Sequence, residues 1–170
     1  LNRVARLGPV EDEAGQVKTE KLDPEREARR QLALAQIRQY PDPVLRMQAQ
    51  PVEGFDDDLV KLVERMKRLM GEAAGVGLAA NQVGVLQRVF VVQPEPEDEA
   101  RALVNPAIVE RSGDTCDENE GCLSMQGVLV PVERDFAVTI EARDEHGEEV
   151  RLEVEGLAAR AVQHELDPLD

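Results

Sequence analysis

The strongest periodic pattern in the chain covers residues 56–71. Apolar side chains recur there at intervals of three and four residues, at Leu59, Leu62, Val63, Met66, Leu69 and Met70. Charged side chains occupy most positions between them, so the pattern predicts one long amphipathic helix in the N-terminal half of the chain. Gly71 and Gly75 follow the apolar stripe and are expected to end this helix.

Beyond Gly84 the pattern changes to that of β-strands. Apolar or alternating segments occur at 85–92, 102–110, 128–132, 137–142 and 150–154. The last two flank a polar turn sequence at 144–147, which is typical of a hairpin. A helical period then restarts at Leu157, Ala158, Ala161 and Val162. These elements predict an α+β fold in which antiparallel strands pack around a C-terminal helix.

Residues 1–35 differ from the rest of the chain in charge and in pattern. They hold seven basic and seven acidic residues, so the net charge of −15 lies entirely in residues 36–170. A helix is expected to begin after Asp23, because Pro24 suits the first helical position. Its modest apolar face would consist of Leu32, Ala35 and Ile37. We interpret 1–35 as an N-terminal extension of a domain spanning 36–170, and the initial Leu as fitting a processed or shortened chain.

The acidic composition argues against several classes of partner. With 20 basic against 35 acidic residues, free nucleic acid is not expected, because it binds clustered Lys and Arg. The apolar runs are too short for a membrane span, and no signal peptide is recognisable at the N-terminus. Cys116 and Cys122 are the two cysteines, too few for a disulfide framework. A cytoplasmic location is therefore predicted.

Two neighbouring residues in the last predicted helix suit hydrolytic chemistry. His164 and Glu165 form half of the H-E-x-x-H device, in which two histidines bind a metal and the glutamate handles a proton. The second histidine of that device would fall at position 168, where this chain has Pro168. Taken alone, the His-Glu pair is weak evidence for a metal site and is more typical of a structural role.

Two further segments, Glu120–Ser124 and Gly75–Gln82, contain candidate site residues. Cys122 is either a small buried hydrophobe or a thiolate ligand for a soft or borderline metal. The glycines of the second segment let the backbone approach a ligand closely, and Gln82 has an amide able to donate to an oxyanion. A phosphate loop is disfavoured, because no Lys-Ser/Thr pair follows the glycines.

In this order and at these separations, the segments resemble the three signature motifs of the peptide deformylase family. The motifs are Gly75–Gln82, Glu120–Ser124 and Gln163–Asp167, and the resemblance covers about residues 36–170. It implies a hydrolase that removes the formyl group from N-formylmethionyl nascent peptides, a co-translational N-terminal processing step in protein biosynthesis. The implied partners are these peptides, with the ribosome as a further candidate.

The metal ligands that the resemblance implies are Cys122 and His164. The metal would be Fe2+, with Ni2+, Co2+ or Zn2+ as substitutes, and it would lie at the C-terminal helix. The family's third ligand falls at Pro168, which has no side-chain donor. The proline is expected to end the helix at Asp167 and to leave His164 in a frayed last turn. Other potential ligands are poorly placed by the sequence: His146, Cys116, Asp167 and the carboxylate of Asp170.

The resemblance also implies catalytic and substrate-binding roles. Glu165 would be the general acid and base. Gln82 and the backbone N–H of Leu123 would donate hydrogen bonds to the oxyanion. The substrate-binding residues would be Val76, Gly77 and Gly121.

The departure at Pro168 leaves two main hypotheses. In the first, the chain is a metallohydrolase of formylmethionyl peptides with a weakened or rescued metal site. In the second, it is a deformylase-like domain that binds peptide N-termini without turnover. A third, in which the motifs only serve the core, is disfavoured by the agreement of all three segments. The end of the chain at Asp170 is interpreted as an apparent truncation.

Overall fold

The computed structural model describes residues 10–11, 17–18 and 23–170. Its helices are α1 (Pro24–Leu34), α2 (Asp57–Glu72) and α3 (Gly156–Leu166), with short 3-10 helices at Pro43–Arg46, Ala80–Val83 and Asp167–Leu169. The strands are β1 (Val10–Glu11), β2 (Val17–Lys18), β3 (Gly77–Ala79), β4 (Val89–Val92), β5 (Arg101–Arg111), β6 (Thr115–Cys122), β7 (Met125–Asp135), β8 (Ala137–Arg143) and β9 (Glu149–Glu155). Over these described ranges, no helix has both the length and the apolar character needed to cross a membrane.

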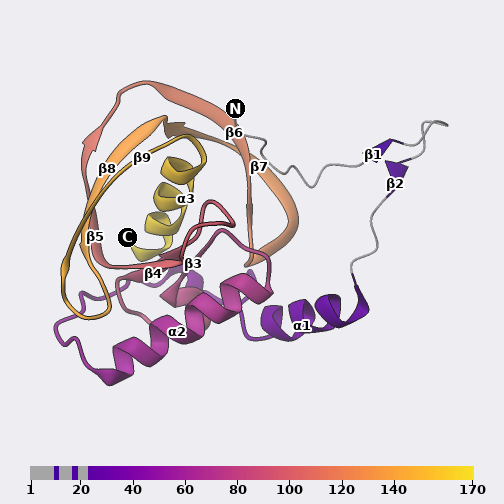
Figure 1. The fold of residues 1–170 in the computed structure, drawn as a ribbon, viewed down its shortest axis with the longest axis horizontal. Helices are drawn as coiled ribbons and strands as arrows, with labels where there is room; N and C mark the ends of the chain where they lie inside the picture. Colours follow the sequence, from indigo (N-terminus) through magenta and orange to yellow (C-terminus); the bar gives the residue numbers. More distant parts are fainter. Residues whose placement is uncertain (1–9, 12–16, 19–22) are drawn as a thin grey trace.

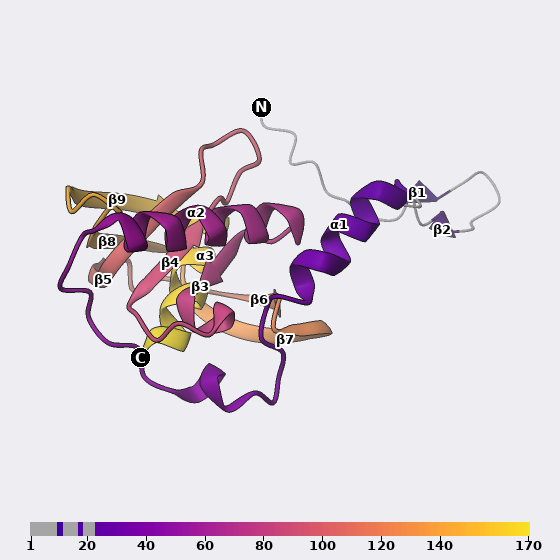
Figure 2. The ribbon, with the colours of Figure 1, turned by 90° about the horizontal axis from the view of Figure 1, so that it is seen from below.

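The main sheet has five strands in the order β3-β4-β5-β8-β9, and each neighbouring pair is antiparallel. Strands β6 and β7 form a separate antiparallel pair, as do β1 and β2. Figure 1 shows α3 in the hollow of the curved main sheet and α2 outside it, and Figure 2 shows α1 extending to one side. The predicted α+β class is confirmed.

Alternate residues of the central strands contribute to two different cores. Val89 and Val91 of β4 pack in the cluster built around α2, whereas Phe90 and Val92 pack in the cluster around α3. Successive side chains of a strand point to opposite faces of the sheet, which explains this division. Because both faces are covered, the strand appears in the sequence as a continuous apolar run.

Helix α2 confirms the long helix that the periodic pattern predicts at 56–71. The carboxylate of Asp56 accepts a hydrogen bond from the backbone N–H of Leu59 at 3.0 Å, which caps the first turn. The helix ends slightly later than predicted: it continues through Gly71 and ends at Glu72. The left-handed conformation that often follows a helix is adopted by Ala74, with a φ of 57°.

The strands differ in extent from the prediction, except for the β8–β9 hairpin, which is confirmed. Of the run at 85–92, only Val89–Val92 forms a strand. The segment expected at 102–110 forms the strand Arg101–Arg111, in which Asn105 takes a left-handed φ of 51° and the register with β8 shifts. The expected strand at 128–132 extends over Met125–Asp135. Its partner β6 was not predicted, because its sequence is mostly polar.

Helix α1 confirms the helix expected after Asp23 but corrects its apolar face. Leu32 is 67% exposed, whereas Ala33, Leu34 and Ile37 are buried against α2 and its neighbours. The buried face therefore includes the predicted Ile37, but Ala33 and Leu34 take the place of Leu32 and Ala35, which are exposed. Most of the predicted extension before Asp23 lies outside the described residues.

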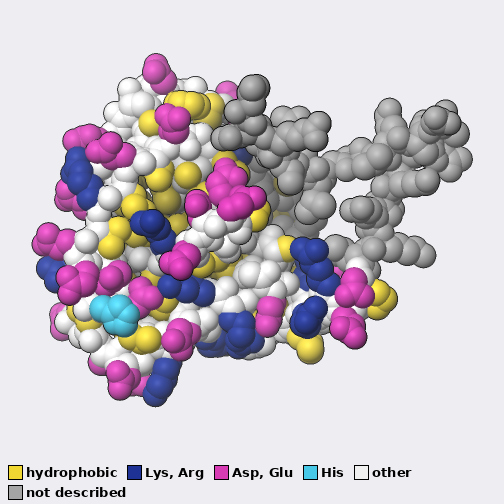
Figure 3. Space-filling model, viewed as in Figure 1, with side chains coloured by type: hydrophobic (Ala, Val, Ile, Leu, Met, Phe, Trp, Pro, Cys, Tyr) yellow, Lys and Arg dark blue, Asp and Glu magenta, His cyan; other side chains and the backbone are white. Residues whose placement is uncertain are grey.

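The surface reflects the acidic composition. Figure 3 shows acidic side chains distributed across one face of the molecule, with basic side chains between them singly or in small groups.

The cap of α2 generates a stability prediction. Replacing Asp56 by Ala removes the acceptor for the Leu59 N–H, and we expect the free energy of unfolding to fall by about 1 kcal/mol. Urea denaturation measures this change. Asp56→Asn keeps a capping oxygen and is the matched control, expected to stay close to the parent protein. Equal losses in the two variants would show that the cap is not the source of the effect.

Candidate active site

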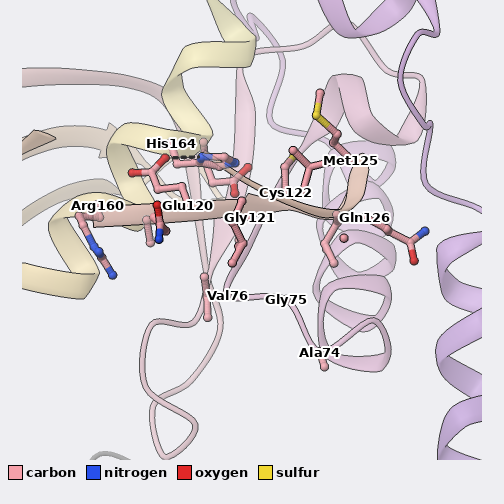
Figure 4. Close-up of a pocket in the computed structure, with 18 of the residues that line it drawn as sticks. Ala74, Gly75, Val76, Glu120, Gly121, Cys122, Met125, Gln126, Arg160 and His164 are labelled. Carbon is pink, nitrogen blue, oxygen red and sulfur yellow. Dashed lines mark hydrogen bonds and ion pairs between the residues drawn. The ribbon is translucent and has the colours of Figure 1, made fainter. Parts of the chain in front are cut away.

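An open cavity of about 490 Å³ lies between the β6–β7 pair, α3 and the loop that leads into β3. Its walls include Cys122 from the end of β6, His164 and Glu165 from α3, and Val76 and Gly77 at the start of β3. Figure 4 shows Cys122, Glu120 and His164 gathered at one part of this cavity and Ala74 and Gln126 at another. The three sequence motifs thus meet around one cavity.

Cys122 and His164 line the same cavity, and Cys122 contributes to the raised pKa of the imidazole. The amide of Gln82 lies beside the sulfur: its Nε2 donates to Cys122 Sγ at 3.6 Å and to Ser124 Oγ at 3.0 Å. The Gln82 Oε1 accepts from the backbone N–H of Ala79 at 2.8 Å, which fixes the side chain at its other end. A thiol, an imidazole and an amide donor are therefore held together.

The imidazole of His164 is oriented by Glu120. Its Nδ1 lies 2.9 Å from Glu120 Oε2, so Nε2 is the ring nitrogen left for the cavity. The hydrogen bond with Cys122 and the nearby carboxylates of Glu165 and Glu120 raise the pKa of His164 to about 9, against a lowering by desolvation. This pKa shift favours the protonated ring when the site holds no metal.

Glu120 is itself paired with Arg134 of β7. The guanidinium donates from Nε and Nη2 to the two carboxylate oxygens, each at 3.0 Å, and also lies 2.8 Å from Asp167. Burial alone would raise the pKa of Glu120, but the hydrogen bonds from Arg134 and His164 overcome this and lower it. Glu120 is therefore a fixed anion that accepts hydrogen bonds from both partners.

Glu165 is in a different environment from Glu120. Its side chain is buried, and among the described residues its Oε2 has no hydrogen-bond partner. Desolvation raises the pKa of Glu165 to about 7, while the charge of His164 acts in the opposite direction. A Cβ atom at Gly77 would overlap this carboxylate, so the glycine makes room for it. The result is a carboxyl group able to take or release a proton near neutral pH.

The remaining predicted site residues, Leu123, Val76 and Gly121, also border the cavity. The Leu123 side chain packs against the α2 core, and its carbonyl accepts a hydrogen bond from Gln39 Nε2 at 2.9 Å. The side chain of Val76 is 43% exposed at the wall. The predicted ligands, substrate-binding residues, Glu165 and Leu123 therefore border one cavity, and the buried Gln82 lies behind it, beside Cys122. Their roles stay predictions.

Pro168 ends the last helix as expected but does not fray it. Helix α3 stops at Leu166, and a 3-10 turn continues from Asp167. The Pro168 carbonyl accepts a hydrogen bond from Asn81 Nδ2 at 2.7 Å, and Leu169 is fully buried. The expectation of a frayed turn is therefore wrong, because these contacts anchor the chain after His164.

The candidate ligands at this cavity are of the right chemical type for a metal, but they are too few. The Cys122 sulfur and the His164 imidazole suit a hydrolytic divalent metal, with the Glu165 carboxyl nearby to handle a proton. They are two ligands, whereas a catalytic site normally has three from the protein. Within residues 23–170, no group of three or more His, Cys, Asp and Glu side chains is arranged to hold a metal. Other candidates are elsewhere: His146 is exposed in the β8–β9 turn, and Asp170 pairs with Arg88.

Two arginines near this site were missed by the sequence interpretation. Arg134 had no local signal, because it reaches Glu120 only through the pairing of β7 with β6. Arg160 had one: it precedes His164 by four residues, a spacing that places two side chains on one face of a helix. It lines the same cavity.

Comparisons with known proteins give one consistent result. Residues 34–170 match the family model described as polypeptide deformylase. The peptide deformylase of Caldicellulosiruptor bescii is 49% identical over 139 residues, which cover 82% of each chain. That of Thermodesulfovibrio yellowstonii is 41% identical over 142 residues, covering 82% of this chain and 86% of the relative. The crystal structure of peptide deformylase from Thermotoga maritima matches with a TM-score of 0.75 and 44% identity, covering 78% of this chain and 89% of that one.

The Arg134–Glu120 pair should be important for stability. Its side chains are 12% and 10% exposed, so Arg134→Met leaves a largely buried carboxylate without its main partner. We expect the free energy of unfolding to fall by about 3 kcal/mol, measured by urea denaturation. Arg111→Met is the control, because Arg111 is half exposed in its pair with Asp135 and should contribute less than about 1 kcal/mol. Similar losses in the two variants would contradict this difference in burial.

Proposed function

Because this chain belongs to the polypeptide deformylase family, we propose that it hydrolyses the formyl group of N-formylmethionyl nascent peptides in a metal-dependent reaction. The observation that carries the proposal is the meeting of Cys122, His164 and Glu165 at one cavity, with the amide of Gln82 donating to the Cys122 sulfur. We place this activity in the domain at 36–170 and treat 1–35 as an extension. The proposed location is the cytoplasm, where a reducing environment keeps a cysteine ligand available.

Cys122 and His164 are the proposed metal ligands. Glu120 accepts the hydrogen of His164 Nδ1 once the ring is neutral, which leaves the Nε2 lone pair for a metal. The proposed ion is Fe2+, with Ni2+, Co2+ or Zn2+ as substitutes, because a thiolate with an imidazole suits borderline metals. Such an ion would supply a water molecule with a lowered pKa as the nucleophile.

The other residues have roles that follow from their surroundings. Glu165 has a pKa of about 7 and an unpaired oxygen, so it can accept a proton from water and later release it to the leaving amine. Gln82 and the N–H of Leu123 are the proposed donors to the oxyanion that develops on the formyl oxygen. Substrate contacts are proposed for Val76, Gly77 and Gly121, which border the cavity.

Pro168 limits the strength of metal binding in this proposal. Its side chain has no donor atom, and its carbonyl already accepts the hydrogen bond from Asn81. Two side-chain ligands with solvent completing the coordination should hold a metal more weakly than three. The contrasting hypothesis, a domain that binds peptides without turnover, stays a prediction that the same experiment tests.

The first test changes position 168. Pro168→His adds a third side-chain ligand and should tighten the binding of Zn2+ or Ni2+ by more than about 100-fold. Residues that only hydrogen-bond to metal ligands already change the metal affinity by about 10–100-fold when mutated, and a direct ligand should contribute more. Competition with a chromophoric chelator measures the affinity, and release of formate from a formylmethionyl peptide measures the activity.

Pro168→Ala is the matched control for this test, because it removes the ring without adding a donor. Metal binding no tighter in Pro168→His than in Pro168→Ala would contradict the assignment of Cys122 and His164 as ligands. Tighter metal binding with no deformylation in either variant or the parent would favour the domain without turnover.

The second test concerns Glu165. Glu165→Gln should lower kcat by about 10²–10⁴-fold, because the amide cannot transfer the proton, while the metal affinity stays within a few-fold of the parent. Steady-state kinetics and the same chelator competition separate the two effects. Glu64→Gln, on the exposed side of α2, is the control and should change neither quantity. Loss of metal with retained turnover would contradict the proton-transfer role.

A further inference from the structure

Helix α1 brings a positive charge to the candidate active-site cavity from outside the family match. The match begins at residue 34, whereas α1 spans Pro24–Leu34. Arg30 of this helix nevertheless lines the cavity. Figure 4 shows α1 next to the part of the cavity where Gln126 lies, away from His164. One wall of the cavity therefore comes from a segment that precedes the matched domain.

The packing of α1 turns Arg30 towards the domain. Arg30 precedes Ala33 and Leu34 by three and four residues, so the three side chains share one face of the helix. Ala33 and Leu34 are buried in the core cluster around α2, which fixes the orientation of this face. The side chain of Arg30 is 32% exposed, whereas its neighbour Arg29 is exposed on a different face. The place of Arg30 at the cavity is therefore set by buried contacts.

The guanidinium of Arg30 is only loosely held by its own helix. Among the described residues its ion-pair partner is Glu27, at 3.7 Å, which is too long for a hydrogen bond. The same carboxylate accepts a hydrogen bond from Gln31 Nε2 at 2.6 Å. The other arginine of the cavity wall, Arg160, is paired with Glu118. Of the two, Arg30 has the donors that remain available to a ligand.

The cavity opens to solvent next to α1. Gln126 and Gly127 of β7 line this part of the cavity and are exposed. A peptide whose formyl group lies at Cys122 and His164 has to leave the cavity, because a nascent chain does not fit inside about 490 Å³. The open end beside Arg30 offers such an exit.

A carboxylate is the peptide group that this exit favours. A guanidinium binds a carboxylate through two parallel N–H···O bonds, which are stronger than a hydrogen bond to a neutral amide. The domain at 36–170 has a net charge of −15, so its field disfavours acidic peptides in general. Arg30 offsets this repulsion at one point of the peptide's path.

We propose that Arg30 is a specificity-determining residue that binds an acidic side chain of the substrate peptide, at one of the residues that follow the formylmethionine. This proposal rests on the proposed function, which places the formyl group beside Cys122 and His164. It gives α1 a role in substrate selection that the matched domain alone does not supply, because the residue that makes the contact lies before residue 34.

The experiment measures binding, so that it does not depend on turnover. Formylmethionyl tetrapeptides with amidated C-termini carry Glu at the second, third or fourth position, and each has a counterpart with Gln there. They are titrated into the full-length protein, and NMR chemical shifts give the dissociation constants. At one position or more, the Glu peptide should bind about three- to fivefold more tightly at low ionic strength, as expected for a partly exposed ion pair. Added salt should reduce this ratio.

Variants of α1 separate a direct contact from a general effect of charge. In Arg30→Gln the ratio of Glu to Gln affinity should fall to one or below, and Arg30→Glu should reverse the preference. Arg30→Lys keeps the charge without the planar fork, so an intermediate ratio is expected. Arg29→Gln is the matched control, because it removes the same charge from an exposed position of the same helix and should leave the ratio unchanged. Glu27→Gln removes the competing carboxylate and should keep or increase the ratio.

Several outcomes would overturn the proposal. A ratio that is the same in the parent and in Arg30→Gln would show that Arg30 does not select the side chain. Equal losses in Arg29→Gln and Arg30→Gln would assign the effect to the charge of the helix. A gain seen only with a peptide that has a free C-terminal carboxylate would show that Arg30 binds the chain end instead. Equal binding of all Glu and Gln peptides would refute the role of Arg30 alone, whereas absence of binding by every peptide would also refute the proposed function.

Discussion

The carboxylate of Glu120 is the contact on which the geometry of the candidate site depends. It lies at the end of β6 and joins two partners that are distant in sequence, Arg134 of β7 and His164 of α3. By occupying Nδ1 of the imidazole, it leaves Nε2 as the ring nitrogen for the cavity, which Cys122 also lines. The register of β6 and β7 brings Arg134 within reach, so strand pairing sets the orientation of a residue on a helix.

Two glutamates of the site show how surroundings assign different chemistry to one residue type. Glu120 is held as an anion by Arg134 and His164, and its pKa is lowered. Glu165 is more deeply buried, and among the described residues its Oε2 has no hydrogen-bond partner, so desolvation raises its pKa to about 7. The first therefore suits a positioning role and the second suits proton transfer. Gly77 contributes to this difference, because a side chain there would displace the Glu165 carboxylate.

The substitution at 168 affects the donor set without disturbing the surrounding fold. Asn81 holds the Pro168 carbonyl, Leu169 fills a buried position, and Arg88 contacts the last residue. These interactions anchor the segment after α3, so His164 keeps its place beside Cys122. A defect in metal affinity at this site would therefore arise from the missing donor rather than from a loosened helix.

The sequence by itself determined the elements whose side chains repeat with a clear local period, namely α2 and the β8–β9 hairpin, and it located the three motifs. It did not predict β6, whose polar residues give no alternating pattern, and it misplaced the apolar face of α1. Only the tertiary structure decided that Arg134 reaches Glu120 and that the turn after His164 is anchored. The physical reason is that periodicity reports which face of an element is buried, whereas these contacts depend on strand register and helix packing between distant segments.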